Sequence, residues 1–116
     1  SSLQIDFQSH GNFDDIDPKV KLNTYRIIQE LLKNIRQHAR ATYALVQLIV
    51  GDDVLTITVE DDGTGFDQNE VKNGIGLYNL KSRVHLLNGS YNIESEREKG
   101  TSVYIEFDLR KTKTRV

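Results

Sequence analysis

A helical repeat of apolar residues between Lys19 and Arg40 is the feature that most restricts the fold of this 116-residue chain. Apolar side chains recur there at spacings of three and four, so one face of a long amphipathic helix must be covered by another element. These apolar residues are Tyr25, Ile28, Leu31, Leu32 and Ile35. The helix therefore predicts a second layer with an apolar face of its own.

Short segments rich in β-branched and aliphatic residues supply that second layer. They cover residues 43–50, 54–60, 91–96 and 101–109, and residues 3–7 form a shorter alternating segment. A second helix is expected over Leu77 to Leu87 with Gly89 as its stop, after a polar loop over residues 66–74. This order predicts an α+β fold, a two-layer α/β sandwich whose mixed, mostly antiparallel sheet is covered on one face by helices.

Length and composition narrow the class of protein. Residues 1–116 are expected to form one domain, with a core over about 19–109 and a short basic tail over 110–116. The absence of cysteine excludes disulfides, thiolate metal sites and cysteine nucleophiles, and a net charge of −2 indicates no nucleic-acid partner. No apolar run approaches the roughly 20 residues that span a bilayer, and no signal peptide is recognised, so we expect a cytoplasmic domain.

Three polar residues of the first helix lie beside its apolar stripe. At about 100° per residue, Glu30, Asn34 and His38 fall close together at the edge of the buried face. On spacing alone, such residues are more often hydrogen-bonded boundary groups than ligands. The alternative is the wall of a pocket, because an asparagine carbonyl oxygen suits a Mg²⁺ ion that keeps waters and shares phosphate oxygens.

Turns that contain glycine follow the strands and open the second helix. Asp61-Asp62-Gly63-Thr64-Gly65-Phe66 places a carboxylate beside exposed backbone at a strand end, where it could accept a hydrogen bond from an adenine amino group. Alone, this is most often just a turn. Gly74-Ile75-Gly76-Leu77 leaves helix N–H groups open to a phosphate. Asn79 replaces the third glycine of a dinucleotide fingerprint, and the Gly-Lys-Ser/Thr of a P-loop is missing.

Taken together and in order, these motifs resemble the ATP-binding catalytic domain of two-component sensor histidine kinases. Gln29–Ala39 resembles the N box of that family, Asp61–Phe66 its first glycine box, Gly74–Val84 its second, and Gly100-Thr101 its late Gly-Thr pair. Residues 25–30 resemble the subfamily that is typically paired with LuxR-type response regulators. The resemblance covers roughly residues 25–109 and implies the Bergerat, or GHKL, ATPase fold.

The resemblance also implies roles for individual residues. Asn34 would be the Mg²⁺ ligand, Asp61 would accept the adenine amino proton, and Thr101 would add a hydroxyl contact. Glu30 matches the acid that activates water in related ATPases, and together with Asn34 it is the catalytic candidate. The remaining nucleotide contacts that the resemblance implies are His38, Gly63, Gly65, Gly74, Gly76 and Leu77.

Two positions depart from the family pattern, Gln37 in place of a basic residue and Asp62 where the wider superfamily often has asparagine. None of the three histidines is followed by an acid as the phosphate-accepting histidine is, so the acceptor is expected in a separate dimerisation domain of the parent protein. The expected function is to bind Mg-ATP and supply its γ-phosphoryl group to that histidine. Two alternatives stay open: a nucleotide-binding regulatory module without kinase activity, and a serine kinase of the anti-sigma-factor type.

Overall fold

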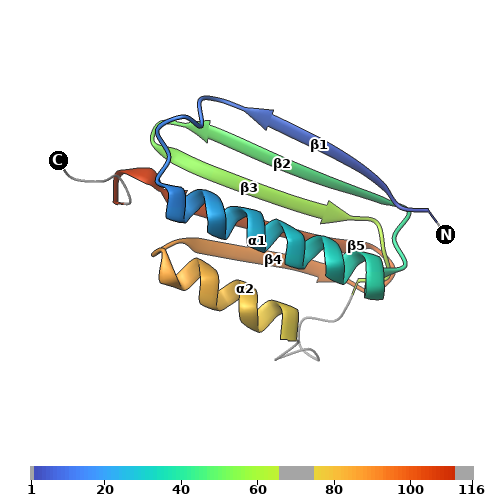
Figure 1. The fold of residues 1–116 in the computed structure, drawn as a ribbon. Coiled ribbons are helices and arrows are strands. Elements are labelled where there is room, and N and C mark those ends of the chain that lie inside the picture. Colours follow the sequence, from blue (N-terminus) through green and yellow to red (C-terminus); the bar gives the residue numbers. More distant parts are fainter. Residues whose placement is uncertain (1, 66–74, 112–116) are drawn as a thin grey trace.

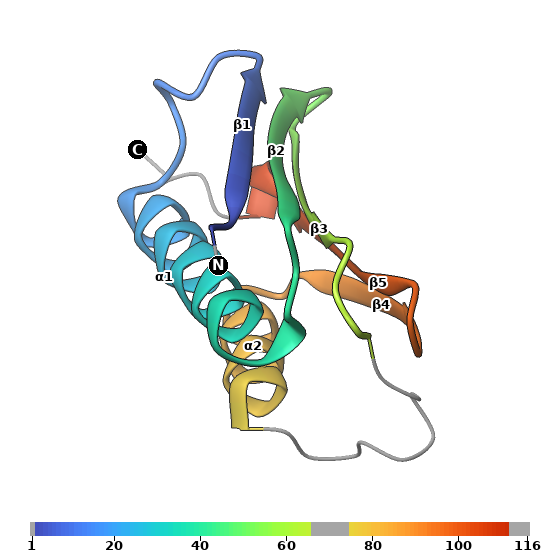
Figure 2. The same ribbon diagram turned by 90° about the vertical axis from the view of Figure 1, so that its right-hand side faces the viewer.

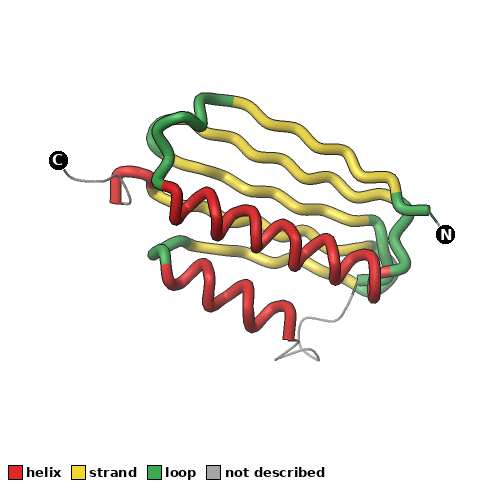
Figure 3. Tube along the Cα trace, in the orientation of Figure 1, coloured by secondary structure: helices red, strands yellow, loops and turns green. Residues whose placement is uncertain are grey.

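The computed structural model describes residues 2–65 and 75–111, with only the backbone described for residues 75–79 and 111. Its elements in chain order are β1 (Gln4–His10), α1 (Pro18–Asn34), β2 (Tyr43–Gly51), β3 (Val54–Asp61), α2 (Ile75–Leu86), β4 (Ser90–Glu96) and β5 (Gly100–Asp108). A π turn (Ile35–Ala39) continues α1, and a 3₁₀ turn (Leu109–Lys111) follows β5. Figures 1 and 3 show these elements. No helix among the described residues is long and apolar enough to cross a membrane.

The five strands form one sheet in the order β1-β2-β3-β5-β4. β1 runs parallel to β2, and the other neighbouring pairs are antiparallel. Figure 2 shows both helices on the same side of this sheet. The predicted α+β sandwich with a mixed, mostly antiparallel sheet is therefore confirmed.

Alternating residues of the central strands β3 and β5 form the floor of the core. Leu55, Ile57 and Val59 of β3 pair in register with residues of β5 on the same face of the sheet. The apolar side chains that cover this floor come from one stripe of α1 and from α2. The fully buried residues of the core include Val20, Ile27, Val46, Leu80, Val84, Ile105 and Phe107. Each such burial contributes about 1.5–3 kcal/mol to folding.

Polar and backbone groups determine where α1 begins and ends. The Asp17 carboxylate accepts a hydrogen bond of 2.8 Å from the Lys19 backbone N–H, and Pro18 occupies the first helical position. The predicted helix continued to about Arg40, but α-helical geometry ends at Asn34 and the π turn follows. Arg40, with φ 52° and ψ 34°, then closes the helix in the left-handed region.

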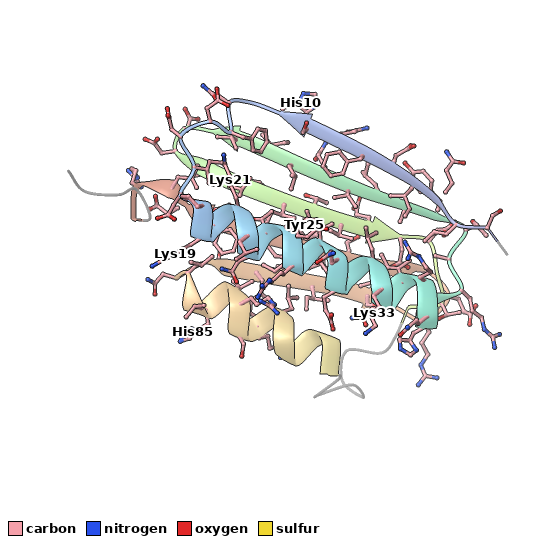
Figure 4. All side chains as sticks on the ribbon, in the orientation of Figure 1. His10, Lys19, Lys21, Tyr25, Lys33 and His85 are labelled. Atoms are coloured by element: carbon pink, nitrogen blue, oxygen red, sulfur yellow. The ribbon has the colours of Figure 1, made fainter. Side chains whose placement is uncertain are left out.

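Two further expectations are corrected by the structure. Tyr25, assigned to the apolar stripe, is 60% exposed, and the buried stripe contains Thr24 instead (Figure 4 labels Tyr25). The first strand extends to His10 rather than stopping near Phe7, because it pairs with β2 over seven residues. Pairing along a neighbouring strand is a long-range property that local alternation does not reveal.

The end of α2 shows a further difference. Gly89 was expected to end this helix, yet Asn88 adopts the left-handed conformation with φ 54°. The N–H of Gly89 bonds to the Val84 carbonyl at 2.9 Å and that of Asn88 to the His85 carbonyl at 3.0 Å, which is a Schellman motif. Gly89 is needed for a packing reason, since a Cβ there would lie 2.6 Å from the Phe107 ring.

Thr24 offers a test of this packing. Its hydroxyl is buried in the centre of the α1 stripe and has no hydrogen-bond partner in the described structure. Thr24→Val keeps the shape and removes the desolvated hydroxyl, so we expect the free energy of unfolding to rise by about 1 kcal/mol and the melting temperature by about 4 °C. Thr24→Ala, which also loses a methyl contact, should gain less. A lower urea midpoint for the valine variant would contradict this account.

Candidate functional site

A cavity of about 240 Å³ lies between the C-terminal end of α1 and the adjoining ends of β3 and β5. Figure 1 shows the end of α1 beside the end of β3. Its apolar wall comes from the core, and five polar side chains from separate parts of the chain line it as well. The described lining residues are Leu31, Asn34, Ile35, His38, Ala39, Val59, Asp61, Thr64, Gly65, Thr101 and Val103.

Asp61 is the acidic group of this cavity. It is the last residue of β3, is half-buried, and lies opposite Thr101 in the sheet register. Burial raises the pKa of its carboxyl, and the hydrogen bond of 2.8 Å from the Gly63 N–H to Oδ1 partly offsets that effect. The result is a desolvated carboxylate that gains from any donor entering the cavity.

Asp62 has the opposite environment, although it is the next residue. Its Oδ1 accepts hydrogen bonds of 2.9 Å from the backbone N–H groups of Thr42 and Tyr43, and its Oδ2 accepts one of 2.7 Å from the Thr42 hydroxyl. These donors, the Thr42 hydroxyl first, lower the pKa of Asp62. Asp62 is exposed and is not among the described lining residues. Its carboxylate therefore accepts hydrogen bonds from groups outside the cavity lining.

The two glycines of this loop allow it to pack tightly between neighbouring elements. A Cβ at Gly63 would clash with the carbonyl of Ala39 in the π turn, and one at Gly65 would clash with the Glu96 carbonyl at the end of β4. Gly65 also needs its positive φ of 61°. The Thr64 N–H donates to the Ala39 carbonyl at 2.6 Å, which joins the loop directly to the π turn.

The π turn and the end of α1 supply the opposite wall. Asn34 is half-buried and lines the cavity, and His38 lines it from an exposed position. Glu30 is half-buried one turn before Asn34, but it is not among the described lining residues. A π turn inside a helix is frequently found at functional sites.

The structure thus brings together five of the predicted site residues, namely Asn34, His38, Asp61, Gly65 and Thr101. Glu30 and Gly63 lie nearby without lining the cavity, and Gly63 serves the loop packing instead. Gly74 falls outside the described residues. The backbone of Gly76 and Leu77 forms the first turn of α2, while their side chains lie outside the description.

Sequence reasoning missed several residues of this site. The apolar wall of Leu31, Ile35, Val59 and Val103 was assigned only to the core, although Val59 and Val103 stand two residues from Asp61 and Thr101 in alternating strands. Ser95 was missed as well. Its buried hydroxyl lies 2.8 Å from the Thr101 hydroxyl and fixes the position of that group. Only the cross-strand register, which pairs Ser95 with Thr101, reveals this contact.

The donor set fits a weakly coordinated magnesium ion. No group of three or more histidine or acidic side chains that could hold a metal is found among the described residues. Asn34 lines the cavity, and its side-chain carbonyl oxygen is the kind of ligand that a Mg²⁺ ion could use there.

An α+β sandwich with this cavity defines a nucleotide-binding domain of the histidine-kinase type. The solved histidine kinase domain of the Erythrobacter litoralis EL346 blue-light activated histidine kinase superimposes with a TM-score of 0.73 at 25% identity, covering 93% of this chain and 56% of that one. The chain belongs to the family of histidine kinase-, DNA gyrase B- and HSP90-like ATPases, whose sequence model matches residues 20–111.

Curated relatives are sensor kinases. The chain is 33% identical over 110 residues to the signal transduction histidine-protein kinase/phosphatase DegS of Brevibacillus brevis, covering 94% of this chain and 28% of that protein. It is 41% identical over 97 residues to the sensor histidine kinase ComP of Bacillus subtilis, covering 81% and 13% respectively. The chain thus spans less than a third of the length of these two relatives.

The opposite pKa shifts of the two aspartates predict opposite effects on stability. The pKa of Asp61 is raised in the folded chain, so its ionisation lowers stability as the pH rises above the unfolded value of 3.8. Asp61→Asn should therefore stabilise the unliganded chain at pH 7, and the gain should disappear below about pH 3.8, where both states are protonated.

Asp62 provides the internal comparison, because its pKa is lowered in the folded chain. Its carboxylate contributes stability above the unfolded pKa, and the contribution is lost as the pH falls through the lower folded value. Asp62→Ala should destabilise at pH 7 and less so in acid. Urea titrations of both variants between pH 3 and 7 measure these differences, and curves of the same sign would show that the assignment is wrong.

Proposed function

We propose that this chain binds Mg-ATP and supplies the γ-phosphoryl group for phosphorylation of a histidine on a separate dimerisation domain of a two-component signalling kinase. The observation that carries the proposal is the half-buried Asp61 carboxylate in an apolar-walled cavity that Asn34 lines from the opposite element. Membership of an ATPase family supports the choice of nucleotide.

The base would occupy the apolar part of the cavity. A carboxylate accepts a hydrogen bond from the adenine amino group, whereas guanine presents a carbonyl oxygen at the same ring position and would be repelled. The cavity of about 240 Å³ is small for a complete triphosphate. We therefore infer that it holds the base end, with Thr101 adding a hydroxyl contact, and that the phosphates extend along the helix end.

The phosphates and the metal would then lie near Asn34 and His38. When bound, Mg²⁺ neutralises negative charge on the phosphate oxygens. In the transfer, an acceptor histidine nitrogen bonds to the γ-phosphorus while the bond to the bridging oxygen breaks, and ADP leaves with that electron pair. The chain's part is to position the donor. Glu30 remains the candidate for orienting the attacking group, because it lies one turn from Asn34 at half-burial.

The acceptor is proposed to lie outside these 116 residues. His10 is exposed at the end of β1, His38 lines the cavity, and His85 is exposed on α2 (Figure 4). None precedes an acid as the acceptor of this family does. The proposed partners are therefore the dimerisation domain of the same parent protein and, indirectly, a LuxR-type response regulator in the cytoplasm.

Calorimetric titration tests the two halves of the site separately. We expect the chain to bind Mg-ATP, and Asp61→Asn to weaken binding at least about tenfold with or without the metal, because the amino group loses a charged acceptor. Asn34→Ala should weaken binding in magnesium and leave the affinity in EDTA unchanged. Asp14→Asn, which changes an exposed acid outside the cavity lining, controls for net charge. Wild-type protein that does not bind would overturn the proposal.

ATP labelled at the γ-phosphate tests whether the acceptor histidine lies on a separate domain. The chain alone should incorporate less than about one tenth of an equivalent of phosphate, because it lacks an acceptor histidine next to an acid. Addition of a dimeric helical domain with such a histidine should produce acid-labile labelling. Binding without transfer would favour a regulatory module, acid-stable phosphoserine on a partner would favour a serine kinase, and rapid self-labelling would contradict the proposal.

A further inference from the structure

We propose that Asp62 is a positioning residue, whose carboxylate clamps the connection between the π turn and β2 against the Asp61 loop and so fixes the separation of the two cavity walls. The inference rests on the proposed nucleotide site and adds a component to it. Three donors meet this one side chain, all from Thr42 and Tyr43, which lie about twenty positions earlier in the chain.

The clamped connection, residues 40–42, lies between two regular elements, and Ala41 within it packs against the core. Arg40 ends the π turn in the left-handed conformation, and regular structure resumes only at Tyr43, the first residue of β2. Thr42 is exposed, and its carbonyl accepts a hydrogen bond of 3.0 Å from Gln4 at the start of β1. The Asp62 carboxylate thus joins the loop after β3 to the start of β2, and the Thr42 carbonyl links the same point to β1. Hydrogen bonds to a charged acceptor are stronger than neutral ones.

Two backbone contacts transmit this restraint to the cavity. The Asp62 N–H donates to the Tyr43 carbonyl at 3.2 Å, and the Thr64 N–H donates to the Ala39 carbonyl at 2.6 Å. Ala39 and Thr64 both line the cavity, so this hydrogen bond joins the π turn to the Asp61 loop at the edge of the cavity. Loss of the Asp62 carboxylate would remove its restraint on Thr42 and Tyr43 and let the wall that carries His38 move away from Asp61. Strand alternation explains why Asp61 faces the cavity and Asp62 the clamp.

Nucleotide titration distinguishes positioning from plain stabilisation. We expect Asp62→Ala to raise the Kd for Mg-ATP about tenfold at a temperature where the variant is fully folded. Asp62→Asn should stay within about twofold, because its amide oxygen still accepts both N–H groups. The matched control is Asp17→Ala, which removes a carboxylate-to-backbone bond at the other end of α1 and should lower the melting temperature without changing the Kd.

Equal losses in Asp62→Ala and Asp17→Ala, or equal losses in the alanine and asparagine variants at Asp62, would overturn the clamp. Amide hydrogen exchange of the unliganded chain tests it independently of ligand. In Asp62→Ala the Thr64 amide, which does not touch Asp62, should exchange at least about tenfold faster, while β4 is unchanged. If the wild type fails to bind ATP, the proposed function fails, and unchanged Thr64 exchange would still overturn the clamp separately.

Discussion

Burial of one face of the β3–β5 pair beneath α1 is the interaction on which the rest of the structure depends. It sets the register in which Asp61 pairs with Thr101, and the two strand ends meet at the edge of the core. It also fixes which end of α1 lies over those residues. The cavity exists because the apolar layer ends there before the strands and the helix do, so core side chains such as Val59 and Val103 become its wall. The packing that forms the core therefore also positions the residues of the cavity.

Two neighbouring carboxylates, Asp61 and Asp62, have very different environments at this edge of the sheet. Alternation turns Asp61 into the cavity and Asp62 away from it, and their pKa values shift in opposite directions. Desolvation of the Asp61 carboxylate lowers the stability of the unliganded domain, and a hydrogen-bond donor on a bound ligand would offset this loss. Asp62 keeps its charge in contact with donors and water, so it stabilises the same loop. The desolvated carboxylate of Asp61 thus lies in a loop that the hydrogen-bonded carboxylate of Asp62 stabilises.

The sequence predicts most of this fold because its apolar periods are strong over long segments. All five strands, the two helices and the layer order follow from local spacing, whereas the roles expected for Asn34 and Asp61 come from the resemblance of their motifs to a known family. The π turn could not be predicted from the sequence. Ile35 is its only buried residue, and a single buried position gives no apolar periodicity from which to recognise the turn. Glu30 was expected at the site from its position on a helical wheel, yet it is not among the described lining residues. A helical wheel gives the direction of a side chain but not how far along the helix a cavity extends. The role of Asp62 depends on residues about twenty positions away, which no local pattern contains.

A nucleotide-binding domain of this family can serve more than one reaction. The family that contains this chain spans histidine kinase-, DNA gyrase B- and HSP90-like ATPases, so the fold is compatible with more than one acceptor of the phosphoryl group. The acceptor decides among these reactions, since the phosphoryl group goes to whichever nucleophile is held in line with it. Here no histidine among the three stands in the acceptor context. Under the proposed function, the geometry that commits the site to histidine phosphorylation would come from another domain docked against the phosphate end of the cavity.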